Sequence, residues 1–97
     1  MYKMTTDKDS KLAQYNLGNC YANGEGVEED KVKAFEWYKK SAEQEDADAQ
    51  NRLGLCYEDG MGTDIDIERA IYWYKQAVNN GCYKAEKRLN KLLLNSN

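Results

Sequence analysis

Apolar residues recur along the chain at three- and four-residue intervals, and glycine-containing segments interrupt them. The first run of this kind comprises Ala13, Leu17, Cys20 and Tyr21. This spacing places its members on one face of an α-helix, the face that packs against the rest of a protein. The run ends at the Asn-Gly-Glu-Gly sequence of 23–26, because glycine accepts a positive φ angle and disfavours continuation of a helix. The pattern therefore predicts short amphipathic helices separated by glycine-containing turns.

A second stripe follows the first turn and comprises Ala34, Trp37, Tyr38 and Ser41. Asp30 precedes this stripe at a position suited to an N-cap, where a carboxylate accepts hydrogen bonds from free backbone amides. Asp66 stands at the same place before a later stripe. The pattern predicts helices near 11–23, 31–45, 47–59, 67–80 and 82–95, with a short helical remnant at about 1–8.

The pattern is also periodic. Displacing the sequence by 36 residues aligns 13–48 with 49–84, and 13 of the 36 aligned positions are identical. Self-similarity at such a period is typical of proteins built from stacked units. The predicted segments are 1–12, the tail of a preceding unit or an N-terminal extension; 13–48 and 49–84, two full units; and 85–97, the first helix of a partial third unit and a C-terminal cap. Such a chain is expected to be a fragment of a longer array, unless Met1 is a natural start.

A single helical hairpin cannot cover both faces of its apolar stripe, whereas stacked hairpins share a continuous core. We therefore predict an all-α fold, an α-α superhelix (solenoid) of helical hairpins. Small residues such as Gly18 and Gly54 would let paired helices approach closely, and the large aromatic residues would fill the space between units. On this interpretation the Trp73 ring is part of the core, and Trp73→Ala should cost several kcal/mol of stability.

The composition excludes several classes of partner. The formal net charge is −3 and the isoelectric point is near 5.0, so there is no surplus of the basic residues that bind phosphate, and no nucleic-acid partner is expected. No apolar run approaches the roughly 20 residues that cross a bilayer, and the N-terminus lacks the apolar stretch of a signal peptide, so no membrane partner is expected. Three cysteines are too few for a disulfide framework. They fit a reducing compartment, and we expect a cytoplasmic location.

The residues that could take part in catalysis or ligand binding have simpler structural interpretations. The chain has no histidine, the commonest general base and metal ligand. Carboxylates cluster within 25–30 and 43–48 without the spacing of a calcium loop, and solvated charge near helix N-termini explains them. The glycine turns lack the preceding strand and following lysine of a phosphate-binding loop. The Trp-Tyr pairs at 37–38 and 73–74 lie on the buried stripe, which favours packing over a stacking platform for bases or sugars. We expect no enzyme activity, no cofactor and no metal.

These motifs resemble the Sel-1-like repeat family, relatives of the tetratricopeptide repeat with a longer, glycine-bearing loop between the helices. The first copy reads AQYNLG at 13–18, NGEGV at 23–27 and AFEWYKKSA at 34–42, and the second has LG at 53–54, DGMG at 59–62 and AIYWYKQA at 70–77. The resemblance covers about 13–93. Two departures are Asn90 in the glycine column and Glu45 where the second copy has Gly81. The resemblance implies a superhelical adaptor that binds other proteins, without naming the partner.

One branch of this family is secreted, disulfide-bonded and linked to β-lactam binding. Its units carry a cysteine late in the second helix and another at the start of the next helix. Cys82 lies near the second of these positions, but Val78 occupies the neighbourhood of the first. Cys20 and Cys56 are equivalent positions on neighbouring units, about 9–10 Å apart at the usual helix spacing and beyond the reach of a disulfide. This branch is therefore disfavoured.

The first helices line the concave side of solenoids built from helical hairpins. On a helical wheel, Asn16, Asn19 and Asn23 lie together about a third of a turn from the buried direction. With their equivalents in later units, the predicted partner-binding residues are Asn16, Asn19, Asn23, Arg52, Leu55, Asp59, Arg88 and Lys91. They are expected to contact an extended peptide or a partner helix, the alternative being plain solvated helix. Four basic residues of the last helix, Lys84, Lys87, Arg88 and Lys91, could also meet an acidic partner, and ordinary surface charge on a helix explains them equally well.

The predicted function is therefore a protein–protein interaction scaffold or adaptor whose partner is a protein or peptide. Two alternatives belong to other classes. One is a small-molecule-binding or hydrolytic member of the same repeat family. The other is head-to-tail self-association of a repeat fragment through its exposed apolar end faces.

Overall fold

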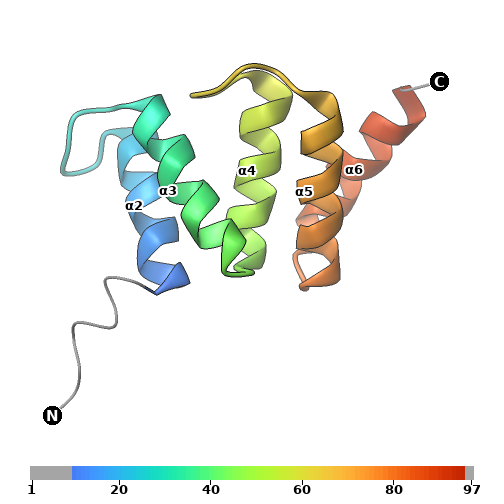
Figure 1. Cartoon of the computed structure of the whole chain (residues 1–97), viewed down its shortest axis with the longest axis horizontal. Helices are drawn as coiled ribbons and strands as arrows, with labels where there is room; N and C mark the ends of the chain where they lie inside the picture. The colour runs from blue at the N-terminus through green and yellow to red at the C-terminus, as the bar shows by residue number, and fades with distance from the viewer. Residues whose placement is uncertain (1–9, 96–97) are drawn as a thin grey trace, which may run out of the picture.

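The computed structural model describes residues 10–95, and over this range it consists of five α-helices joined by short turns (Figure 1). They are α2 (Lys11–Asn23), α3 (Lys31–Glu43), α4 (Ala47–Asp59), α5 (Ile67–Asn79) and α6 (Lys84–Asn95). The all-α prediction is confirmed. The helical remnant expected at about 1–8 lies outside the described residues.

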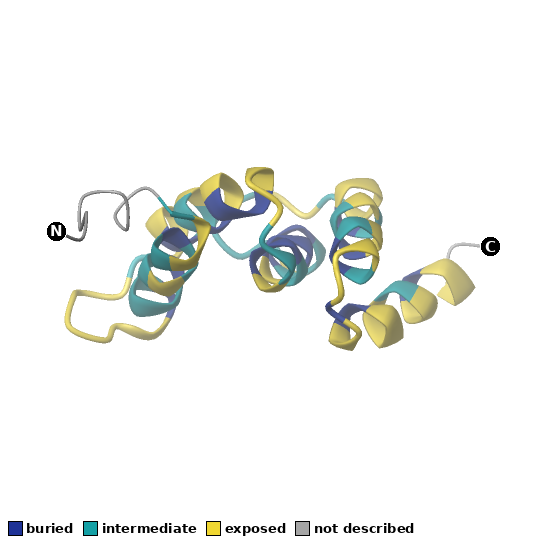
Figure 2. Ribbon diagram, turned by 90° about the horizontal axis from the view of Figure 1, so that it is seen from below, coloured by how far each residue is buried: buried dark blue, intermediate teal, exposed yellow. Residues whose placement is uncertain are grey.

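The helices form a row in which each packs chiefly against the next one in the sequence. The molecule is consequently elongated, with principal extents of 53 × 28 × 16 Å. The first helices of the units, α2, α4 and α6, lie on one side of the row, and α3 and α5 lie on the other (Figure 2). The row arches, so that α2 and α6 stand at its two ends on the same side with α4 set back between them (Figure 2). The first helices therefore line the concave side.

Side-chain caps begin α2, α3, α4 and α5, and left-handed glycines end the first helix of each full unit. The carboxylates of Asp30, Asp46 and Asp66 each accept a hydrogen bond from the backbone amide three residues later, at 3.0–3.1 Å. The N-caps predicted at Asp30 and Asp66 are thus confirmed. Gly24 and Gly60 adopt φ angles of 69° and 75° directly after α2 and α4, a conformation that favours glycine. These signals explain why the predicted bounds 11–23 and 47–59 match the helices.

Three helix ends differ from the prediction. The third helix of the row, α4, begins as expected, but α3 ends at Glu43, α5 ends at Asn79 and α6 begins at Lys84. Glu45 and Gly81, 36 residues apart in the repeat, have φ angles of 68° and 102°. A residue at positive φ cannot continue a right-handed helix, so the turns take up the residues that the periodicity had assigned to helices.

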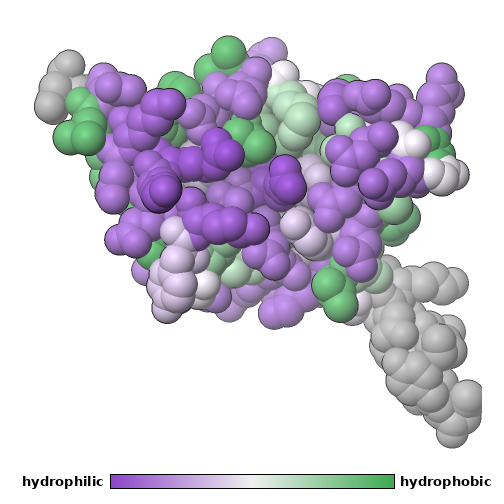
Figure 3. All heavy atoms as spheres, turned by 180° about the vertical axis from the view of Figure 1, so that it is seen from behind, coloured by the Kyte–Doolittle hydropathy of each residue, from purple (hydrophilic) through white to green (hydrophobic). Residues whose placement is uncertain are grey.

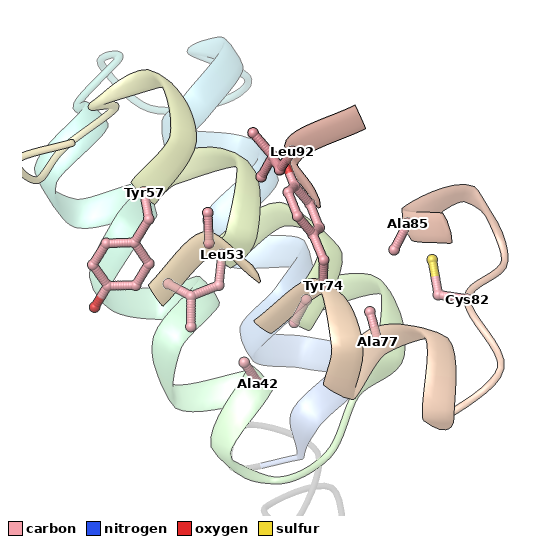
Figure 4. Packing of buried hydrophobic residues seen from close by; sticks show 10 residues of the cluster. Ala42, Leu53, Tyr57, Tyr74, Ala77, Cys82, Ala85 and Leu92 are labelled. Carbon is pink, nitrogen blue, oxygen red and sulfur yellow. The ribbon is translucent and has the colours of Figure 1, made fainter. Parts of the chain in front are cut away.

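The buried stripe of α4 is fully formed. Ala49, Leu53 and Cys56 are 0% exposed and Tyr57 is 7% exposed, because α3 packs on one side of this helix and α5 on the other. Figure 4 shows Leu53 in the larger core cluster, together with side chains from α3, α5 and α6. Here the sequence prediction is confirmed.

The equivalent stripe of α2 is only partly buried, contrary to the prediction. Ala13, Leu17, Cys20 and Tyr21 are all half-buried. Within the described residues α2 packs chiefly against a single helix, α3, so its outer side is left uncovered. The same sequence pattern thus gives different burial according to the number of neighbours.

Tyrosine, and not tryptophan, provides the central ring of each hairpin. Tyr38 and Tyr74 are 1% and 0% exposed, and each ring lies directly over the glycine of the preceding helix. A Cβ atom on Gly18 would lie 2.6 Å from the Tyr38 ring, and one on Gly54 would lie 2.7 Å from the Tyr74 ring. The close approach predicted at these glycines is confirmed.

The tryptophans were predicted to lie on the buried stripe, and the structure buries them only in part. Trp37 and Trp73 are half-buried, because each is one residue before the core tyrosine and points about 100° away on the helix. The Trp73 ring still packs against the larger core cluster and meets the Tyr72 ring edge-on at 5.0 Å. The Trp37 ring lies under the Lys40 ammonium, 5.1 Å from its centroid.

Candidate partner-binding surface

The predicted partner-binding residues all belong to the first helices and so to the concave side. Most of them are exposed, namely Asn16, Asn23, Arg52, Asp59, Arg88 and Lys91. Asn19 and Leu55 are half-buried. The face that α2, α4 and α6 share is largely hydrophilic (Figure 3). Such a face can contact a partner without disturbing the core.

Asn19 also supports the fold. Its Oδ1 atom accepts a hydrogen bond from the Tyr38 hydroxyl at 2.6 Å, which satisfies the one polar group of a buried ring. In the second unit the Tyr74 hydroxyl donates instead to Glu58 Oε1 at 2.7 Å. Substitution of Asn19 would therefore affect packing as well as any contact with a partner, and Asn19 is a poor probe of binding.

Three of the predicted residues, Arg52, Leu55 and Arg88, come together around a hollow of about 310 Å³ between α4 and α6. The hollow is lined by Asn51, Arg52, Leu55, Lys84, Lys87 and Arg88, and we call it the cationic hollow. The other predicted residues do not line it. Lys84 and Lys87 belong to the basic patch that the sequence predicts, whereas no sequence pattern singles out Asn51.

The lining of the cationic hollow carries four basic side chains and no carboxylate. Within residues 10–95, no ion pair joins any of the four to an acidic side chain. Arg52 lies near the Tyr15 side chain of α2 and the Tyr38 hydroxyl of α3. Partial burial alone would lower the pKa of the Arg52 guanidinium, but these neighbouring tyrosines raise it above its usual value. Arg52 is therefore charged at the edge of the hollow.

Asn51 has an unusual feature. Its Oδ1 atom is buried, and within the described residues it has no hydrogen-bond partner. A buried acceptor without a donor costs about 1–3 kcal/mol, so native proteins rarely leave one. Asn51 is also one of the residues that line the cationic hollow.

A second hollow, of about 540 Å³, lies near the loop between α2 and α3. Its lining includes three successive carboxylates, Glu28, Glu29 and Asp30, beside Tyr21, Val27 and Lys33. Glu29 forms an ion pair of 2.9 Å with Lys31. The predominance of carboxylates makes this loop unsuited to phosphate, in keeping with the structural role predicted for its glycines.

The thiols are free and two of them are buried, Cys56 and Cys82. Burial raises the pKa of the Cys56 thiol to about 12, so this group is protonated and unreactive at neutral pH. In the described part of the chain, no three cysteine or carboxylate side chains gather closely enough to hold a metal ion. No helix between residues 10 and 95 combines the length and apolar character that a membrane crossing requires.

Comparison with protein families finds the Sel1 repeat twice in this sequence, over residues 11–46 and 47–82. The chain belongs to the Sel1 repeat family. The matched Sel1 units begin two residues before the units 13–48 and 49–84 set by internal alignment, which is a difference in where a periodic pattern is cut. The resemblance stated from the sequence is confirmed. Sel1 repeats commonly serve as scaffolds for protein interactions and are generally not enzymes.

Solved structures of Sel1 proteins are similar over most of the chain. A Sel1 repeat protein from Oxalobacter formigenes is 38% identical over 87% of this chain and 24% of its own, with a TM-score of 0.85. The protein c5321, a protective antigen of uropathogenic Escherichia coli with an SLR fold, is 33% identical over 88% of this chain and 18% of its own, with a TM-score of 0.85.

Cysteine rich protein B of Helicobacter pylori is 28% identical over 81% of this chain and 59% of its own, with a TM-score of 0.78. The chain thus spans about a quarter or less of the first two proteins and about three fifths of the third. No curated protein matches the sequence. The Sel1 comparisons therefore establish the fold and the family.

Proposed function

We propose that this chain is a protein-interaction segment that binds an extended peptide or a partner helix on its concave face. The observation that carries the proposal is the alignment of Asn16, Arg52 and Arg88. These residues occupy one position of three successive first helices, and all three are exposed on the same side of the row. A line of exposed side chains at the repeat spacing suits a ligand that runs across the helices.

The proposal is supported by the variation of the exposed column on the concave face, which the core does not share. The core residues of α4 repeat those of α2, while the exposed column changes from asparagine to arginine. Packing therefore leaves the identity of these side chains open, as binding to a specific partner requires.

We also propose a cytoplasmic location, which a tagged full-length protein would test by cell fractionation.

The test compares two triple variants with the same change in charge. The concave variant is Asn16→Ala/Arg52→Ala/Arg88→Ala, and the convex control is Asn79→Ala/Lys39→Ala/Lys75→Ala, whose residues are exposed on the second helices. Proteins captured by the wild type from the source organism would be purified, and their affinities measured by calorimetry. Because the concave variant loses the packing of Arg52 beside Tyr15 and Tyr38, a small fall in its melting temperature is expected.

The proposal predicts a purified partner that binds the wild type and the convex control equally and the concave variant at least about tenfold more weakly. A partner that is lost only by the convex control would overturn it. Light scattering over a range of concentrations belongs to the same experiment, because Leu12 and Leu94 are 61% and 75% exposed near the two ends of the row. A mass that rises with concentration would favour self-association through these ends.

A further inference from the structure

The cationic hollow lies between the first helices of the second and third units and does not follow from the repeat. Shifting its lining back by 36 residues gives the corresponding positions between α2 and α4, which are Tyr15, Asn16, Asn19, Asp48, Asn51 and Arg52. That set contains one cation and one carboxylate, whereas the cationic hollow contains four cations. The repeat thus provides an internal comparison in which only one of two equivalent places has become strongly basic.

This concentration of positive charge runs against the character of the whole chain. The formal net charge is −3, yet the hollow holds four of the 14 basic residues and no acidic one. Lys84, Lys87 and Arg88 are exposed on α6, and like charges this close repel one another. A bound anion would relieve that repulsion.

Two further features of the hollow describe the anion. Leu55 is half-buried in the lining and offers an apolar contact. The buried Asn51 Oδ1 is an acceptor without a donor, so the matching ligand carries a hydrogen-bond donor as well as negative charge. A peptide with acidic side chains has carboxylates, apolar side chains and backbone N–H donors together. Free phosphate has no apolar part to contact Leu55, and a DNA backbone has no hydrogen-bond donor.

We propose that the cationic hollow binds an acidic peptide segment of a partner protein, with carboxylates paired to Arg52 and Arg88 and a backbone N–H donated to Asn51 Oδ1. This inference rests on the proposed function, since it names the chemistry of a ligand on the same concave face. Arginine suits the task because its planar guanidinium can hold a carboxylate through two parallel hydrogen bonds. Arg52 from α4 and Arg88 from α6 both line the hollow, so one ligand can reach both.

The direct test uses a fluorescent, end-blocked peptide with the sequence Gly-Glu-Glu-Leu-Glu-Glu-Gly and an analogue in which glutamine replaces every glutamate. Binding to the full chain would be followed by fluorescence anisotropy at low and at near-physiological salt. The expected result is that the glutamate peptide binds at least about tenfold more tightly than its analogue, and more weakly as salt is added.

Variants then locate the site. Arg52→Gln/Arg88→Gln should weaken binding of the glutamate peptide at least about tenfold, because each charge-assisted bond is lost. The control Lys39→Gln/Lys75→Gln makes the same change in net charge on the convex side and should leave the affinity within about twofold. Equal losses in both variants would mean a general attraction between charges and would overturn the proposal.

Asn51→Leu provides a second test, in which stability and peptide affinity should change in opposite directions. Removing the unpaired acceptor should raise the melting temperature, while loss of the contact to the peptide N–H should weaken binding several-fold. A structural residue would change stability and leave the affinity alone, and that result would overturn the role assigned to Asn51.

Three other outcomes would also overturn the proposal. These are no binding of the glutamate peptide at low salt, equal or tighter binding of a single-stranded oligonucleotide of the same charge, and occupation of the hollow by the acidic 24–30 loop of a second copy. The last would appear as a dimer that Glu28→Gln/Glu29→Gln dissociates. A purified partner lost by the concave variant but not displaced by the peptide would leave the proposed function intact and remove this inference alone.

Discussion

The backbone of Gly62 lies directly against the carbonyl group of Lys31, so the glycine loop of the second unit is packed onto the start of α3 in the first. A Cβ atom on Gly62 would overlap that carbonyl and would lie 2.9 Å from Phe35 Cβ. Gly26 is the equivalent residue of the first unit and has the same kind of φ angle, 76° against 78°, but a Cβ atom there would meet nothing within 4 Å. The two glycines therefore separate conformational strain from contact between units.

We expect Gly26→Ala to lower the free energy of unfolding by about 1–2 kcal/mol, the cost of a left-handed conformation with a side chain. Gly62→Ala should cost at least about 2 kcal/mol more, because the loop must also move away from α3. Urea unfolding followed by circular dichroism measures both changes. Equal losses would show that the packing of Gly62 on Lys31 contributes nothing.

Glu45 is the one non-glycine residue at positive φ between residues 10 and 95, and its equivalent in the next unit is a glycine. Replacing it with glycine should stabilise the chain by about 0.5–1 kcal/mol, since strain is relieved at some cost in chain entropy. Gly81→Glu, the reciprocal change, should destabilise it by a similar amount. Thermal melts of the two single variants would check this, and a loss of stability in Glu45→Gly would contradict the strain.

The two tryptophans should differ in their contributions to stability. Truncating a fully buried large aromatic residue costs about 3–5 kcal/mol, so Trp73→Ala, at a half-buried ring on the larger core cluster, should cost roughly 2 kcal/mol. Trp37→Ala should cost about 1 kcal/mol or less, because its ring contacts Lys40 at the surface. Denaturant titrations would rank them. An equal or larger loss for Trp37→Ala would contradict the assignment of the rings.

Alkaline pH should destabilise the fold. Burial raises the pKa of Tyr38 and of Cys56 to about 12, and burial with the bond to Glu58 raises the pKa of Tyr74 further. Unfolded phenols and thiols titrate near 10 and about 8.5, so above these values the unfolded chain has lost protons that the folded chain keeps. The stability therefore falls as pH rises, by about 1.4 kcal/mol per pH unit for each such group, until the folded pKa is reached.

Urea titrations between about pH 8 and 11 would measure this slope. Tyr38→Phe should make the fall of stability with pH shallower by the contribution of one titrating group. The variant also loses the bond to Asn19, at every pH. Tyr72→Phe removes a hydroxyl from a residue that is 53% exposed and serves as the control. A wild-type stability that stays constant up to pH 11 would be incompatible with buried, protonated tyrosines.

The sequence predicted features that depend on local chemistry. Gly24 and Asp30 act within one turn of their own helices, so their roles could be read from spacing alone. The positive φ of Glu45 could not, since glutamate carries no signal for that conformation, and only its alignment with Gly81 pointed to it. The half-burial of Leu17 depends on which neighbours α2 has, and a repeated pattern cannot show that.

The same distinction applies to the candidate surface. Arg52 and Arg88 were predicted to share one face because both occupy one column of the repeat, and in the structure both line the cationic hollow. Asn51 was missed because its column contains Tyr15 and Lys87 in the neighbouring units and shows no common chemistry. Its buried, unpaired oxygen depends on how the helices pack in three dimensions, which the sequence pattern does not indicate.

Because packing is between sequence neighbours, the length of this scaffold can change in steps of one unit. Because each helix contacts chiefly the helices before and after it, a duplicate of residues 47–82 inserted after residue 82 would meet the same kinds of surface on both sides. Each duplicate would lengthen the row by one step and add another arginine to the line formed by Arg52 and Arg88. The number of units would then set the length of ligand that the concave face can bind. The residues in the column of Arg52 and Arg88 would set which ligand sequence the face accepts.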